Sequence, residues 1–160
     1  MALTPDHLKK TDVDRNEMIA LLRFDIVNET DHMHFYLLNA STVTGIQRMF
    51  LRPWLLEEAA SEMKHVSAFM DKLVALEAAE AIPHPFSEPH LYSDSTSIVR
   101  EAIRLESEVV QNYVLRISQC DSLAEREDDP FWTHLGLFFE EQIEHSHKDL
   151  DELRQIDMGL

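Results

Sequence analysis

Two short motifs in this chain place a histidine three positions after a glutamate. Glu62 precedes His65, and Glu144 precedes His147. On a helix, residues three apart lie on one face, so a carboxylate oxygen and an imidazole nitrogen can reach the same ion. Carboxylates with one imidazole suit Fe²⁺ or Mn²⁺, and zinc is a further alternative. One such pair is usually a solvated surface pair, whereas two together predict a metal site.

Two more glutamates lie within apolar helical patterns. Glu29 shares its face with one group of apolar residues, and Glu106 shares its face with another. The first group is Leu22, Ile26, Met33 and Tyr36, and the second is Ile103, Val110 and Tyr113. The apolar positions of the first helix also include Leu37 and Ala40. A bare carboxylate is costly to bury without a cation. Both glutamates are therefore predicted to face inward as ligands, with Glu108 as the alternative to Glu106.

Four long helices must position these residues, because apolar residues recur at three- and four-residue steps. The expected ranges are 12–44, 47–79, 94–120 and 129–156. Thr11 or Asp12 caps the first helix, and Gly45 stops it. Asp129 followed by Pro130 marks the start of the fourth.

The connections between the helices predict the topology. Segment 81–93 holds three prolines and is too proline-rich for helix. About 15 linking residues reach ~50 Å at ~3.3 Å each, enough to run along a helix of ~45 Å. Tight turns join the other neighbours. The expected fold is therefore an all-α four-helix bundle with one long crossover between helices two and three. Pro53 moves the expected start of helix two towards Arg52, because a proline within a helix kinks it. The sequence shows no evident internal repeat.

The composition narrows the class of protein. The 160 residues carry a formal charge of −16 at pH 7 and one cysteine, Cys120. That charge repels nucleic acid and anionic membranes and concentrates cations. A single cysteine excludes a disulfide within the chain and a Cys₄ metal site. The N-terminus has no apolar signal core, so a cytoplasmic protein without membrane or nucleic-acid partners is expected.

The motif-bearing segments resemble those of bacterioferritins. From Asn28-Glu29 to Phe35-Tyr36 the chain resembles their first-helix motif, in which a tyrosine follows the metal-binding glutamate by seven positions. Segment 62–65 resembles their second-helix signature, segment 102–106 the third-helix ligand segment of ferritins, and segment 144–153 the fourth-helix ending. The resemblance covers about 15–157 and implies a ferritin-like di-iron bundle over 12–158 after an N-terminal extension, 1–11.

The resemblance also implies a di-iron site with two iron ions per subunit. Glu29 and His65 would bind the first ion, and Glu106 and His147 the second. Glu62 and Glu144 would bind both ions. Tyr36 would lie beside the pair as a hydrogen-bond or electron donor. Its alternative is an ordinary core tyrosine.

Met63 occupies the position of the axial haem ligand in the family that the chain resembles. Two copies from neighbouring subunits would hold one haem, so one haem per two subunits is expected. Helical geometry turns Met63 about 100° away from Glu62. The alternative is a dimer contact without haem.

Two differences from the family bear on assembly. The chain stops 13 residues after His147 (160 − 147), where subunits of 24-subunit ferritins continue into a fifth helix. A homo-oligomeric shell of 12 subunits is therefore expected, with 24 as the alternative. The N-terminal extension has only Lys9 and Lys10 beside Asp6 and Asp12, which argues against DNA binding.

The expected function is iron storage and detoxification by a ferroxidase, which oxidises Fe²⁺ to Fe³⁺ with O₂ or H₂O₂ and deposits mineral in a hollow shell. Two alternatives remain open. One is another di-metal enzyme, such as a peroxide reductase or a manganese catalase. The other is a non-enzymatic helical assembly protein.

Overall fold

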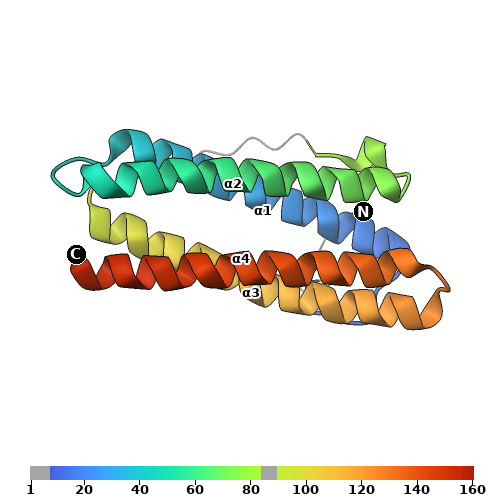
Figure 1. The fold of residues 1–160 in the computed structure, drawn as a ribbon. Helices are drawn as coiled ribbons and strands as arrows, with labels where there is room; N and C mark the ends of the chain where they lie inside the picture. Colours follow the sequence, from blue (N-terminus) through green and yellow to red (C-terminus); the bar gives the residue numbers. More distant parts are fainter. Residues whose placement is uncertain (1–7, 84–89) are drawn as a thin grey trace. The chain divides into compact units, whose positions relative to one another are not determined.

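The computed structural model describes residues 8–83 and 90–160, where it has four long helices and no strand. The helices are α1 (Arg15–Thr42), α2 (Arg48–Ala75), α3 (Ser95–Arg126) and α4 (Pro130–Gly159), with a short 3₁₀ helix η1 (Ala79–Ala81) after α2 (Figure 1). The predicted all-α fold is confirmed. In these two ranges no helix is long and apolar enough to cross a membrane. Residues 1–7 of the predicted extension and 84–89 of the predicted crossover lie outside the described residues.

The chain divides into two compact units. The α1–α2 unit comprises Leu22–Glu101 with Leu160, and the α3–α4 unit comprises the residues before Leu22 together with 102–159. Most of α1 and all of α2 belong to the first unit. Most of α3 and nearly all of α4 belong to the second. That residues 12–158 act as one bundle domain stays a prediction.

Within the α1–α2 unit, the two helices run antiparallel and are joined by a tight turn. Gly45 lies in this turn with a φ of +73°, a backbone conformation that glycine adopts without strain. Gly45 therefore lies in the turn, but α1 already ends at Thr42, so the prediction that the helix runs to Thr44 and stops at Gly45 was wrong. Apolar side chains of both helices form the core, among them Leu22, Ile26, Tyr36, Ala40, Leu51, Leu55, Phe69 and Leu73. Leu37, one of the apolar positions of the predicted first helix, is exposed.

The long connection after α2 returns to the end of the unit where α1 and α2 are joined. Asn39, near the end of α1, donates a hydrogen bond from Nδ2 to the His90 carbonyl (3.3 Å). Its Oδ1 accepts one from the Tyr92 backbone N–H (3.3 Å). Because α2 has 28 residues, about 42 Å at 1.5 Å per residue, the connection spans the length of the helix. The predicted long crossover is confirmed.

Side-chain caps begin three of the helices. Asp14 and Glu17 form a capping box at α1, in which each side chain accepts a hydrogen bond of 2.8 Å from the other's backbone N–H. The cap is therefore Asp14, and the prediction of Thr11 or Asp12 was wrong. Asp94 caps α3 by accepting a hydrogen bond from Ser97 N–H. Asp129 accepts one from Phe131 N–H at α4, as predicted.

Helix α2 begins before its proline, contrary to the expected start near Arg52. It starts at Arg48 and contains Pro53. The proline removes the N–H that would bond to the Met49 carbonyl. Met49 is strongly exposed, so water can satisfy that carbonyl. The helix tolerates the proline for this reason.

Helix α3 continues to Arg126, six residues beyond the predicted end at Cys120. The extra turns bury Leu123, which lies three positions after the buried Cys120 and therefore on the same face of the helix. Arg126 forms an ion pair with Asp12 (Nη1 to Oδ1, 2.6 Å) and donates a hydrogen bond to the Val13 carbonyl. These contacts within the α3–α4 unit stabilise a segment whose polar composition predicted a loop.

Candidate metal centre

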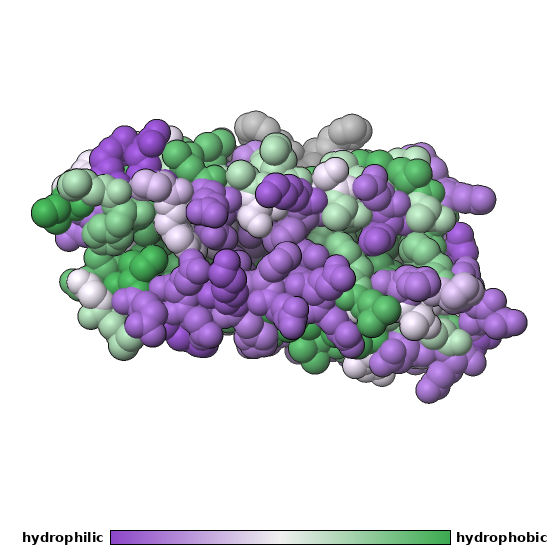
Figure 2. Space-filling view, viewed as in Figure 1, coloured by the Kyte–Doolittle hydropathy of each residue, from purple (hydrophilic) through white to green (hydrophobic). Residues whose placement is uncertain are grey.

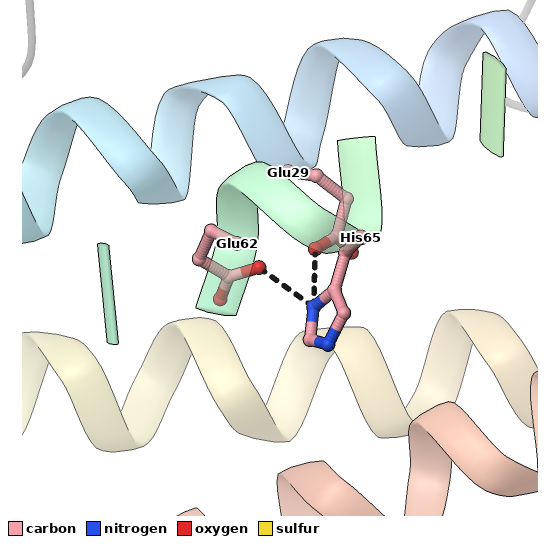
Figure 3. Close-up of side chains that lie close together, drawn as sticks. All are labelled: Glu29, Glu62 and His65. Atoms are coloured by element: carbon pink, nitrogen blue, oxygen red, sulfur yellow. Dashed lines mark hydrogen bonds and ion pairs between the residues drawn. The ribbon is translucent and has the colours of Figure 1, made fainter. Parts of the chain in front are cut away.

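Glu29 on α1 and the Glu62–His65 pair on α2 meet between the two helices (Figure 3). His65 Nδ1 lies 3.0 Å from Glu62 Oε2 and 3.3 Å from Glu29 Oε2. Both glutamates are buried, with exposed fractions of 1% for Glu29 and 4% for Glu62. The predicted inward orientation of Glu29 is therefore confirmed, Glu62 is buried beside it, and His65 points at both.

The spacing of these donor atoms fits a shared divalent cation. One ligating atom from each of the three residues lies within 4.8 Å of the other two. Two donors that bind an ion at about 2.1 Å and at right angles lie about 3.0 Å apart. The distances from His65 Nδ1 to the two carboxylate oxygens match this value closely. Two carboxylates and one imidazole form a donor set suited to Fe²⁺, Mn²⁺ or Zn²⁺.

The electrostatics of Glu29 show how the cluster holds together without a cation. Burial alone would raise the pKa of its carboxyl group, because it removes water from the charged form. Hydrogen bonds with Glu62 and His65, and the positive charges of His65 and His32, outweigh burial and lower the pKa to about 2. Glu29 is therefore anionic at neutral pH and is ready to bind a cation.

Helix α3 buries Glu106 and leaves Glu108 outside. Glu106 is 2% exposed. Glu108 is exposed and accepts a hydrogen bond of 2.5 Å from the Arg104 guanidinium. Of the two alternatives, Glu106 faces the interior. Its role as a ligand stays a prediction.

Helix α4 does not direct its Glu-x-x-His pair inward. Glu144 and His147 are both exposed, and hydrophilic residues gather along the visible face of α4 (Figure 2). The buried stripe of α4 is Trp132, Leu135, Gly136, Phe139, Gln142, Ser146, Leu150 and Leu153. Glu144 is two residues from Gln142 and from Ser146, so at about 100° per residue it points nearly opposite to both. The structure therefore exposes both residues of the fourth-helix pair, and their role as metal ligands stays a prediction.

Two other predicted site residues lie on α1 and α2. Tyr36 is fully buried, and its ring packs edge-on against Trp54 of α2 with a centroid distance of 5.8 Å. Met63 is 60% exposed, as its rotation away from Glu62 requires. The functional roles of both stay predictions.

Sequence reasoning missed His32 on α1, which it did not single out as a site residue. His32 is only 6% exposed. One of its ring nitrogens and a carboxylate oxygen of Glu62 lie within 4.8 Å of each other. A signal was present, because Glu29 and His32 form another Glu-x-x-His pair.

Comparison with known proteins places this arrangement in a family. The model of the ferritin-like domain matches residues 19–158. The chain belongs to the ferritin-like domain family. Among curated proteins, none matches this ferritin-like chain.

A solved structure shares the fold of this ferritin-like chain. It is described as a crystal structure of ferritin like, diiron-carboxylate proteins from Bacillus anthracis str. Ames. The TM-score is 0.76 at 21% sequence identity, and the match covers 97% of this chain and 99% of that chain. The likeness therefore shows a ferritin-like helical bundle fold over nearly the whole length of both chains.

Proposed function

We propose that this protein is a ferroxidase, which binds Fe²⁺ as its substrate between α1 and α2 and oxidises it to Fe³⁺. One observation carries the proposal. Two buried carboxylates and an imidazole converge there at ligand spacing in a chain of the ferritin-like family. The similar fold from Bacillus anthracis is described as a diiron-carboxylate protein, which supports iron over other divalent metals.

Each residue of the cluster has a defined task in this proposal. Glu29 and Glu62 supply anionic oxygens, which are hard ligands and favour Fe³⁺ over Fe²⁺. His65 supplies the lone pair of Nδ1 once that nitrogen has lost its proton, so Fe²⁺ binding releases protons. Because the site is buried, the carboxylates attract a cation more strongly than they would in water.

The electrons and protons balance as follows. Two Fe²⁺ become two Fe³⁺ and release two electrons. O₂ takes these two electrons with two protons and becomes H₂O₂, or H₂O₂ takes them with two protons and becomes two waters. With O₂ or H₂O₂ as the oxidant, we propose two iron ions per chain and storage of the Fe³⁺ product in an oligomeric shell.

A kinetic experiment tests the proposal. Anaerobic protein is mixed with two Fe²⁺ per chain, O₂ is admitted, and Fe³⁺ formation is followed by absorbance. We expect faster oxidation than in buffer, a rate near that of buffer for Glu62→Gln, and an unchanged rate for Glu57→Gln. Glu57 is a matched control, because it lies on α2 but is exposed. Equal rates for buffer and wild type would refute the ferroxidase function.

We also propose the bacterioferritin-type haem site at Met63. Its support is the exposure of the thioether on α2, where a ligand or a second copy of the chain can reach it. The absorption spectrum of protein produced with ample haem tests this. A sharp haem band that Met63→Leu abolishes is the expected result, and a spectrum without that band would contradict it.

A further inference from the structure

Helices α1 and α2 share seven buried positions, although α1 also buries Leu21, Thr30 and Phe35, whose counterparts in α2 are not buried. Both helices have 28 residues, and α2 begins 33 positions after α1 (48 − 15 = 33). The buried residues of α2 are Leu51, Leu55, Glu58, Ala59, Glu62, Phe69 and Leu73, and each follows by 33 positions a buried residue of α1, namely Met18, Leu22, Asp25, Ile26, Glu29, Tyr36 and Ala40. The chain thus contains an internal repeat, although none was expected from its sequence.

The repeat includes the residues that could bind metal. Glu29 and His32 of α1 correspond to Glu62 and His65 of α2, again 33 positions apart. Because α1 and α2 run antiparallel, this correspondence pairs Glu29 with Glu62 and His32 with His65. His65 contacts both glutamates through Nδ1, so His32 is the residue of α1 to consider as its counterpart.

The contacts within the α1–α2 unit agree with this pairing. His32 and Glu62 have ligating atoms within 4.8 Å of each other, as do His65 and Glu29. Burial has the largest effect on the pKa of Glu29 and raises it, whereas Glu62 and His65 lower it. The charge of His32 lowers it further, by a smaller amount. His32 therefore has a ring nitrogen close enough to the Glu62 carboxylate to share an ion with it, and its charge acts on Glu29.

We infer that His32 is the imidazole ligand of a second cation, so that α1 and α2 hold two divalent cations with the carboxylates of Glu29 and Glu62 shared between them. This inference rests on the proposed function for the identity of the metal as iron. It assigns to His32 the role that the fourth-helix His147 was expected to have. His147 is exposed on the hydrophilic side of α4.

Metal stoichiometry tests the inference without any redox reaction. Co²⁺ is titrated anaerobically into the metal-free protein, and binding is followed by calorimetry and by the visible absorption of bound Co²⁺. Two Co²⁺ per chain are expected for the wild type. For His32→Ala we expect one, with the second ion at least about 100-fold weaker, since even outer-shell changes cost 10- to 100-fold.

Three variants complete the design. His32→Gln keeps a polar side chain and should also bind one Co²⁺. This second variant, together with circular dichroism of each variant, separates the loss of a ligand from a folding defect in His32→Ala. His34→Ala is the matched control on α1, and His147→Ala tests the fourth-helix alternative. Both should retain two Co²⁺.

The outcomes separate this inference from the ferroxidase function. Two Co²⁺ in folded His32→Ala, or a loss in His147→Ala instead, would overturn the assignment of His32 even if the wild type oxidises Fe²⁺. A fall from two Co²⁺ to one in both His32 variants would support it even if the wild type failed to oxidise Fe²⁺. No Co²⁺ bound by the wild type would overturn the assignment as well.

Discussion

The carboxyl groups of Glu29 and Glu62 are buried together with the imidazole of His65 between them. Burying like charges side by side is costly unless protons or cations neutralise them. Without a cation, hydrogen bonds among the three groups offset part of that cost. A divalent cation would replace those protons and supply a stronger attraction. The side chains are thus arranged for metal binding at the expense of stability.

This trade-off predicts the behaviour of Glu62→Gln. The amide keeps nearly the same shape but removes one buried charge, so we expect the metal-free variant to be more stable than wild type by about 1–3 kcal/mol. Metal should stabilise the wild type by about 2.7 kcal/mol per site at 100 times Kd and should stabilise the variant far less.

Thermal unfolding with and without Co²⁺ measures both effects. Glu57→Gln, on the exposed side of α2, should unfold like the wild type under both conditions. A metal-induced rise in Tm that is equal in wild type and Glu62→Gln would contradict this role of Glu62.

At the scale of helices, the ends depend on backbone conformations that few residues adopt well. Helix α2 ends where Glu77 adopts a φ of +56°. The Ala78 N–H then donates to the Leu73 carbonyl and the Glu77 N–H to the Val74 carbonyl, each at 2.9 Å. This is a Schellman motif, in which glycine is the favoured residue at the left-handed position.

Glycine at position 77 should therefore stabilise the protein. Glu77→Gly relieves about 1–2 kcal/mol of backbone strain and loses part of it to unfolded-state entropy, so a net gain of about 0.5–1 kcal/mol is expected. Urea unfolding monitored by circular dichroism measures the change.

Gly45 provides the opposite test. Its φ is also positive, and a Cβ there would lie 3.1 Å from Gln47 Oε1. Gly45→Ala should thus destabilise the protein by about 1 kcal/mol. Equal midpoints for Glu77→Gly, Gly45→Ala and wild type would contradict the strain argument.

The helices themselves could be predicted from sequence, whereas the direction of one motif could not. Apolar periodicity and the Asp129–Pro130 start locate α4 well. The spacing of Glu144 and His147 shows that they share a face, but the spacing alone does not say which face is buried. The buried stripe through Phe139, Gln142 and Ser146 is on the opposite side of α4. Because Gln142 and Ser146 are polar, apolar periodicity does not identify this side as the buried one.

Glu29 could be predicted because it lies within an apolar stripe of its own helix. His32 was missed because a histidine looks like a surface residue until its neighbours are known. The late end of α3 was missed for a similar reason. Its last turn depends on Arg126 reaching Asp12 and Val13, which are over a hundred positions away in the chain.

At the scale of the whole molecule, the α1–α2 unit exposes several large apolar side chains. Large side chains that are exposed there are Leu37, Ile46, Met49, Phe50, Met63 and Val74. Exposed apolar side chains of this size are typical of surfaces that bind other proteins when they form a continuous patch. The homo-oligomer stays a prediction.

Native mass spectrometry should therefore detect an assembly. With a subunit of 18.6 kDa, a 12-subunit shell has a mass of about 223 kDa (12 × 18.6). Met63→Glu places a charge among apolar contacts and should shift the protein towards smaller species, while exposed Lys64→Glu serves as the control. A monomer in the wild type would contradict the shell.

The central claim is that Glu29, Glu62 and His65 bind a divalent cation. Anomalous diffraction at the iron edge, from crystals soaked anaerobically in Fe²⁺, tests it most directly. We predict a peak about 2.0–2.3 Å from a carboxylate oxygen of each glutamate and from His65 Nδ1. Iron bound only at the exposed carboxylates of α4, with no peak between α1 and α2, would contradict the claim.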